Sequence, residues 1–122
     1  MSQPATKSIR PFIGAKDYHK SLDFYQSVGF VAVPLGEKMT YLHYGSTGFY
    51  LQDAYVKDWI DNTMAFLEVT DADQFLEELK AKDLPGKYPG VRLSGMVVND
   101  WGQEFFLHDP SGVLWHIGTF NA

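Results

Sequence analysis

Two stretches of the chain space their apolar residues three to four positions apart, which is the period of an α-helix. The first predicts a helix over 17–28, with Asp17 as its N-cap and Gly29 as its end. The second predicts a helix over 71–82, with apolar residues on one side and Glu and Lys on the other. A short apolar run precedes each helix, at about 8–15 and about 64–69, and predicts a strand.

Three further short strands are expected after each helix. The runs 30–35, 38–44 and 48–52 are separated by glycine-containing turn sequences, and the runs 91–99, 103–108 and 113–118 follow the second helix in the same way. The segment 84–90 is rich in turn residues, and 53–62 links the two halves, with room for a helical turn. The predicted order is therefore strand–helix–strand–strand–strand, twice.

The two halves also repeat each other in sequence. Asp17 and Asp71 open the two helices 54 positions apart (71 − 17). Gly48 begins one closing strand and Gly112 lies just before the other, 64 positions apart (112 − 48). A period this long indicates a duplicated supersecondary unit. We expect two superposable units, one over about 8–52 and the other over about 64–118, with each of these pairs in equivalent positions.

Composition narrows the class of protein. At 122 residues, 45% of them apolar, the chain is expected to form one compact domain over 1–122. The net charge of −5 argues against nucleic acid as a partner, because phosphate binding requires a basic face. The absence of cysteine excludes thiolate chemistry, and no apolar run approaches the roughly 20 residues of a membrane helix. A cytoplasmic location without membrane contact is the expectation.

Two motifs resemble the vicinal oxygen chelate superfamily, which includes glyoxalase I, bleomycin-resistance proteins, fosfomycin-resistance enzymes and extradiol dioxygenases. The segment 17–25 (DYHKSLDFY), followed by Gly29 and Phe30, is similar to the family's opening helix. The segment 105–116 (FFLHDPSGVLWH) is similar to its closing hairpin. The resemblance implies an α+β fold in which two tandem βαβββ modules form a cupped, partly open barrel-like sheet with helices on the outside.

The resemblance also implies where a metal would bind, on the first and last strands of each module. The matching positions are Arg10, Gln52, Met64 and His116. Only His116 is a good ligand for a catalytic divalent metal, which needs about three His or carboxylate ligands. We therefore expect no metal and no other cofactor, as in the bleomycin-resistance type.

Strand alternation predicts which side chains share a face with these positions. Trp115 and Leu51 are expected on the opposite, helix-covered face. Trp101, in a turn, is expected beside a ligand or in a dimer contact. The predicted ligand-binding residues are Arg10, Phe12, Tyr50, Gln52, Met64, Phe66, Trp101, Leu114 and His116. Aromatic and aliphatic walls with a few polar groups are typical of a small-molecule site, although the same apolar residues also suit a collapsed interior.

The interpretation that follows is a protein that binds and sequesters a small organic ligand without a metal and without catalysis. One alternative is a glyoxalase-like lyase or a dioxygenase that uses a divalent metal anchored by His116. Another is a homodimeric scaffold with a vestigial cavity. A homodimer is expected, because an exposed strand edge and exposed aromatic residues need covering. The sequence leaves open the identity of the ligand and whether the modules pair within a chain or between chains.

Overall fold

The computed structural model describes residues 5–122, which form two modules joined by a short helix. Module one contains β1 (Phe12–Gly14), α1 (Tyr18–Val28), β2 (Val31–Pro34), β3 (Met39–Tyr44) and β4 (Thr47–Gln52). The linking helix is α2 (Lys57–Asp61). Module two contains β5 (Met64–Glu68), α3 (Ala72–Ala81), α4 (Leu84–Lys87), β6 (Arg92–Leu93), β7 (Val97–Asn99), β8 (Gly102–His108) and β9 (Leu114–Phe120).

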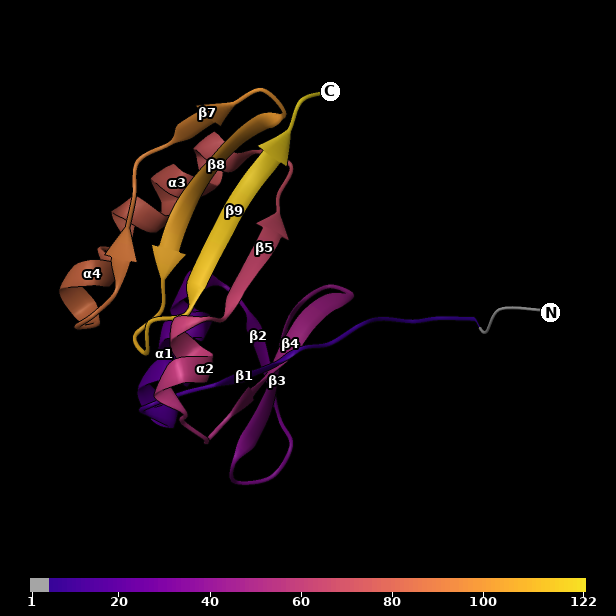
Figure 1. Cartoon of the computed structure of the whole chain (residues 1–122), viewed down its shortest axis with the longest axis vertical. Coiled ribbons are helices and arrows are strands. Elements are labelled where there is room, and N and C mark those ends of the chain that lie inside the picture. The colour runs from indigo at the N-terminus through magenta and orange to yellow at the C-terminus, as the bar shows by residue number, and fades with distance from the viewer. Residues whose placement is uncertain (1–4) are drawn as a thin grey trace.

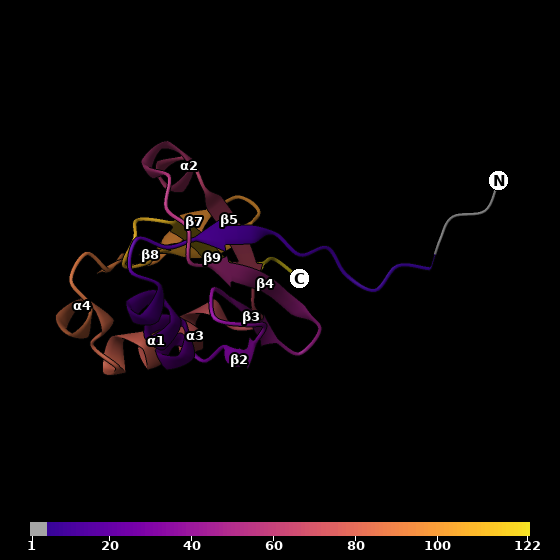
Figure 2. The same ribbon diagram turned by 90° about the horizontal axis from the view of Figure 1, so that it is seen from below.

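Each module forms its own sheet, and the two sheets have the same topology. The strand order is β1-β4-β3-β2 in module one and β5-β9-β8-β6 in module two, where β7 also pairs with β8. In both sheets the first strand runs parallel to the last, and the remaining pairs are antiparallel. Figure 1 shows the two sheets one above the other, and Figure 2 shows α1, α3 and α4 gathered on one side with α2 on the other.

The core lies between the helix-covered sides of the two sheets. Trp115 of β9 packs against Phe49 of β4 and Phe30, with ring centroids 5.2 and 5.9 Å apart. Leu51 is completely buried beside them, so the expected orientation of Trp115 and Leu51 is confirmed. Because both sheets bury this side, the opposite face of each sheet is left toward solvent.

Both helices begin at the residues that the sequence indicated. The Asp17 side chain accepts a hydrogen bond from the backbone N–H of Lys20 at 3.2 Å, and the Asp71 side chain accepts one from Gln74 at 3.0 Å. Each aspartate thus satisfies a backbone donor in the first turn that has no helical partner. This repeated cap confirms the predicted equivalence of Asp17 and Asp71.

Three expected elements differ from the structure. The first strand begins at Phe12 rather than near residue 8, because Pro11 has no N–H with which to extend the ladder, so Arg10 precedes the strand. The expected strand over 91–99 is broken into β6 and β7 by the segment 94–96. The turn-rich 84–90 contains the single helical turn α4, with a proline in its first turn.

The predicted equivalence of Gly48 and Gly112 is wrong by two residues. Phe12 pairs with Tyr50, and its equivalent Phe66 (12 + 54) pairs with His116, so the closing strands are offset by 66 (116 − 50). Accordingly, Gly48 lies inside a β-hairpin, whereas Gly112 lies in a loop with φ of +108°. A shift of two residues leaves every side chain on its predicted face.

Within residues 5–122, no helix is both long enough and apolar enough to span a membrane.

Candidate functional site

The solvent side of the module-one sheet carries a row of aromatic side chains. Phe12, Tyr50 and Tyr41 lie side by side on β1, β4 and β3, with neighbouring ring centroids 4.9 and 5.6 Å apart. His43 stacks on Tyr41 at 5.0 Å. We call this surface the Tyr50 face, and it consists of Arg10, Phe12, Tyr41, His43, Tyr50 and Gln52.

Arg10 supplies the positive charge of the Tyr50 face. Its guanidinium lies 4.1 Å from the ring centre of Tyr41, within the range of a cation–π contact, and its Nη1 donates to the Tyr50 hydroxyl at 3.0 Å. The hydrogen bond to Tyr50 raises the pKa of Arg10, so the group keeps its charge. Arg10 is exposed, so its planar side chain can meet an anionic or aromatic partner from solvent.

The module-two sheet carries an equivalent aromatic row. Phe66, His116 and Phe106 lie side by side on β5, β9 and β8, at the positions that Phe12, Tyr50 and Tyr41 occupy in module one. Phe106 meets the His116 ring edge to face at 5.1 Å. We call this surface the His116 face, and it consists of Met64, Phe66, Trp101, Glu104, Phe106, Leu114, His116 and Phe120.

One end of the His116 face is a cluster of three aromatic rings. Trp101 packs against Phe120 at 4.9 Å and against Phe66 at 5.8 Å. Phe66 and Phe120 remain 43% and 50% exposed, and nearby Met64 remains 63% exposed. The turn before β8 therefore places Trp101 on this face, where it forms a wall with Phe66 and Phe120.

His116 is held by a carboxylate on the neighbouring strand. Its Nδ1 lies 2.8 Å from Glu104 Oε1, and Asn99 Nδ2 donates to Glu104 Oε2 at 3.0 Å. The side chains of His116 and Glu104 are 26% and 13% exposed. The other ring nitrogen, Nε2, is buried and has no hydrogen-bond partner among the described residues.

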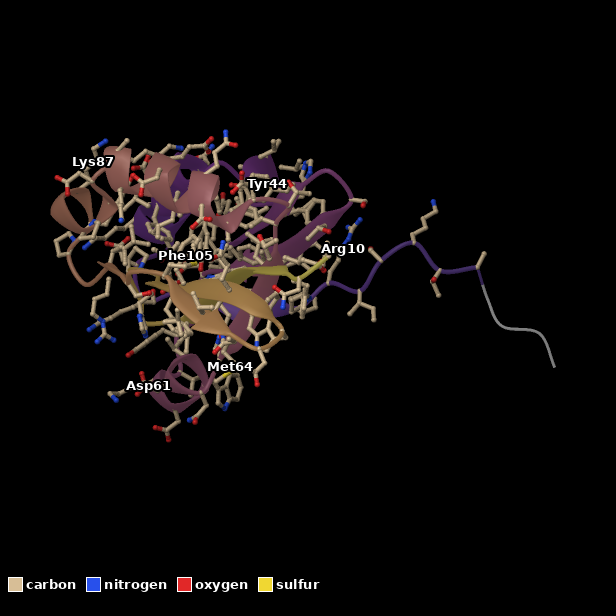
Figure 3. All side chains as sticks on the ribbon, turned by 90° about the horizontal axis from the view of Figure 1, so that it is seen from above. Arg10, Tyr44, Asp61, Met64, Lys87 and Phe105 are labelled. Carbon is tan, nitrogen blue, oxygen red and sulfur yellow. The ribbon has the colours of Figure 1, made fainter. Side chains whose placement is uncertain are left out.

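The two faces do not form one cavity by facing each other within a chain. Both lie on the side of their sheet that is turned away from the shared Trp115–Phe49 core. Figure 3 shows Arg10 where the N-terminal segment leaves the domain, well separated from Met64, which lies near α2. The structure thus groups the nine predicted site residues into two sets, with Arg10, Phe12, Tyr50 and Gln52 on one face and Met64, Phe66, Trp101, Leu114 and His116 on the other.

Two clefts border these faces, and a third lies on the helix side. A cleft of about 190 Å³ runs between Phe12, Gln52 and Trp59 of α2. A cleft of about 400 Å³ separates the β3–β4 turn from β5 and includes Phe66 and Trp115. A third, of about 480 Å³, lies on the helix side between Tyr44 and Phe75, where burial and the nearby Glu78 raise the pKa of Tyr44 to about 12.

The side chains at the family's metal positions do not fit a catalytic metal. Among residues 5–122 there is no group of three His, Asp or Glu residues placed to bind an ion. His116 has one carboxylate neighbour, Glu104, and the other three expected metal positions carry Arg10, Gln52 and Met64. A guanidinium cation, a neutral amide and a thioether supply no third or fourth His or carboxylate ligand of the kind that a catalytic divalent metal requires.

Five residues of these faces were not predicted from the sequence, namely Tyr41, His43, Glu104, Phe106 and Phe120. The signal for Tyr41 was present, because a two-residue turn at 45–46 pairs Tyr44 with Thr47 and therefore Tyr41 with Tyr50. Glu104 and Phe106 depended on the longer β8–β9 connection, whose register no turn type specifies.

Comparison with known proteins gives the fold. No protein-family model and no curated protein matches the sequence. The bleomycin-binding protein of Streptomyces verticillus, solved with copper(II)-bleomycin, is 22% identical over 98% of this chain and 100% of that one, with a TM-score of 0.81. TnmS3, an antibiotic-binding protein from a Streptomyces species, is 19% identical over 98% of this chain and 100% of its own, with a TM-score of 0.77. Lactoylglutathione lyase from Agrobacterium tumefaciens is 16% identical over 95% of this chain and 96% of its own, with a TM-score of 0.71.

The chain has the vicinal oxygen chelate fold. This confirms the expected α+β architecture of two βαβββ modules. Because binding proteins and a lyase share the vicinal oxygen chelate fold, the function of this chain has to be argued from its own side chains.

Proposed function

We propose that the protein binds a small, planar organic molecule on its aromatic faces and sequesters it without a metal. The observation that carries this proposal is the pair of equivalent aromatic rows, Phe12–Tyr50–Tyr41 and Phe66–His116–Phe106, both left toward solvent. Exposed apolar patches rimmed by polar groups mark interaction sites, since they are costly to leave in water.

The energetics favour a flat ligand over an aliphatic one. Each aromatic pair is worth about 0.5–1.5 kcal/mol beyond the area that it buries. Neighbouring rings in the two rows lie 4.9–6.5 Å apart, so one flat ligand can contact two of them at once. Arg10 on one face and Glu104 with His116 on the other supply the few polar groups that orient a bound molecule.

A homodimer would complete the site. The Tyr50 face carries the cation Arg10, whereas the His116 face carries Glu104 and, on the same side of β5, Glu68. A two-fold dimer that sets the Tyr50 face of one copy against the His116 face of the other would pair these charges and form two equivalent crevices. Pairing between chains fits the structure better than pairing within a chain, because the two faces of one chain do not meet.

The fold neighbours support the class of ligand. Two of them are antibiotic-binding proteins, and one was solved with copper(II)-bleomycin. We extend from them only the general role, which is reversible capture of an organic molecule with aromatic rings. No observation on the described residues favours the metal-dependent lyase or dioxygenase alternative, because His116 and Glu104 have no third His, Asp or Glu placed to complete a metal site.

Isothermal titration calorimetry with bleomycin and with a panel of planar aromatic antibiotics tests the proposal. We expect at least one compound to bind at micromolar concentration or below, and Tyr50→Ala and His116→Ala to weaken it. Tyr55→Ala is the matched control, because Tyr55 is a partly exposed tyrosine outside both faces. Binding that survives both face substitutions, or a panel in which nothing binds, would contradict the proposal.

A further inference from the structure

Asn99 and His116 both direct a hydrogen-bonding nitrogen at the Glu104 carboxylate, across three adjacent strands. Glu104 lies between the other two, because β8 pairs with β7 on one side and with β9 on the other. Its Oε2 accepts from Asn99 Nδ2 at 3.0 Å, and its Oε1 lies 2.8 Å from His116 Nδ1. No lysine or arginine takes part in these bonds, so the carboxylate is directed at the imidazole.

The hydrogen bond to Glu104 determines which nitrogen of His116 carries the proton. A carboxylate can only accept, so Nδ1 must be the donor in the 2.8 Å contact. The Nε2 atom is buried without a partner, and a buried N–H there would need an acceptor that the surroundings do not supply. The neutral tautomer with its proton on Nδ1 is therefore favoured, and the lone pair of Nε2 remains available.

We propose that His116 Nε2, oriented by Glu104, is a hydrogen-bond acceptor subsite for an N–H or O–H group on an aromatic ligand. This inference rests on the proposed binding function and narrows the ligand to planar rings that carry a donor, such as indoles, pyrroles or phenols. A buried acceptor gains a full hydrogen bond when such a donor arrives, and it rejects ring systems that present only an acceptor.

Phe66 is the side chain that gives access to this subsite. Nε2 is closed to solvent, and the two rings beside the imidazole are Phe66, nearly parallel to it at 6.5 Å, and Phe106, edge to face at 5.1 Å. Phe66 is 43% exposed and lies on the edge strand β5, so its ring can turn toward solvent. A ligand ring then takes the place of Phe66 against the imidazole, with its donor toward Nε2.

Substitution of Glu104 by Gln should reverse the hydrogen-bonding role of His116 Nε2. The Gln carbonyl would keep the hydrogen bond from Asn99 Nδ2, so its NH₂ would point at His116 Nδ1. Nδ1 would then become the acceptor, and the proton would move to Nε2. Glu104→Gln thus retains the shape of the site while converting Nε2 from an acceptor into a donor.

The tautomer is measured in the ligand-free protein by long-range ¹H–¹⁵N NMR of ¹⁵N-labelled histidine. For wild type we expect the shift of an unprotonated Nε2, and for Glu104→Gln that of a protonated Nε2. The other histidines, such as exposed His19, give the reference signals. A protonated Nε2 in wild type overturns the inference whether or not any ligand binds.

Ligand preference is measured by calorimetry with indole and benzofuran, which have the same shape but carry a ring N–H and a ring oxygen respectively. Wild type should favour indole about tenfold, the scale of one net hydrogen bond. Glu104→Gln should abolish or reverse that preference, and Glu77→Gln, at an exposed side chain of α3, should keep it. Equal binding of the two rings to wild type overturns the inference but leaves the proposed function standing, whereas binding of neither ring counts against both.

Discussion

The phenol of Tyr25 donates a hydrogen bond to the carboxylate of Asp109 at 2.6 Å, and this bond joins the two modules. Tyr25 lies on α1 of module one, while Asp109 begins the loop before β9 of module two. The same phenol oxygen accepts from Trp115 Nε1 at 2.9 Å, and Asp109 Oδ1 accepts from three backbone N–H groups of its own loop. Both aromatic faces are built on the two sheets that this buried network holds together.

Removing the phenol oxygen should loosen the junction. Tyr25→Phe leaves Trp115 Nε1 and one oxygen of Asp109 without their partner in a buried site, so we expect a loss of about 1–3 kcal/mol in the free energy of unfolding. Urea denaturation checks it, with Tyr55→Phe as the control at an exposed tyrosine. A loss as small as that of the control would show that the network does not stabilise the junction.

Stability should also fall in alkali. Burial, with Asp109 beside it, raises the pKa of Tyr25 well above its usual value, and burial with Glu78 nearby raises the pKa of Tyr44 to about 12. In the unfolded chain both titrate near 10, so their contribution to stability is complete below pH 10 and is lost as the pH rises above it. Urea denaturation between pH 8 and 11 should show the decline, and Tyr25→Phe should reduce its slope by at most about 1.4 kcal/mol per pH unit. An unchanged slope in that variant would contradict the assignment.

The duplicated helix caps should be equivalent in energy as well as in geometry. Asp17→Ala and Asp71→Ala each remove one side-chain hydrogen bond to the third residue of the helix, so each should cost about 1 kcal/mol of unfolding free energy. Asp58→Ala is the control, because α2 has no side-chain cap. If only one of the two cap substitutions were destabilising, the energetic equivalence would fail.

Much of the architecture could be predicted from the sequence because its signals are local. Asp17 and Asp71 cap helices through contacts three residues away, and Gly29 ends α1 with φ of +125°, a conformation that favours glycine. The register of the closing strands could not be predicted from a matching glycine. The β3–β4 turn has two residues, 45–46. In the β8–β9 connection the backbone N–H of Asp109 donates to the carbonyl of Val113, which encloses three residues. The glycines of the two turns therefore lie at different positions relative to the strands.

The candidate site was predictable only in part. Strand alternation correctly placed Phe12, Tyr50, Phe66 and His116 on the side of their sheets opposite Trp115 and Leu51, because the period of two survives an error of two residues. The relation between the two faces depends on how the sheets pack through Trp115 and Phe49, which no local pattern encodes. For the same reason the sequence could not show that Arg10 is exposed and stacked on Tyr41 rather than buried.

Arg10 should contribute to ligand affinity through its charge and its planar stacking. Arg10→Met removes the contact with Tyr41 and the donor to Tyr50, so calorimetry should show weaker binding of any captured ligand that carries an anionic group. Lys80→Met on the exposed side of α3 should leave affinity unchanged. Equal affinities for wild type and Arg10→Met would remove Arg10 from the site.

The proposed homodimer should depend on the aromatic faces. Sedimentation equilibrium of wild type at micromolar concentration should give a dimer, and Phe12→Asp or Phe66→Asp should give monomers, because each places a charge within an apolar contact. The control variant Val98→Asp should remain a dimer, because Val98 is exposed on the side of β7 that points away from the His116 face. A wild-type monomer under these conditions would rule out the two-chain crevice.

The most direct test of ligand capture by the aromatic faces is NMR mapping of the isotopically labelled protein during titration with bleomycin or whichever aromatic compound binds most tightly. We expect the largest saturable shifts on the rows Phe12–Tyr50–Tyr41 and Phe66–His116–Phe106. Saturable shifts confined to the cleft between Tyr44 and Phe75, with both rows unchanged, would contradict this expectation.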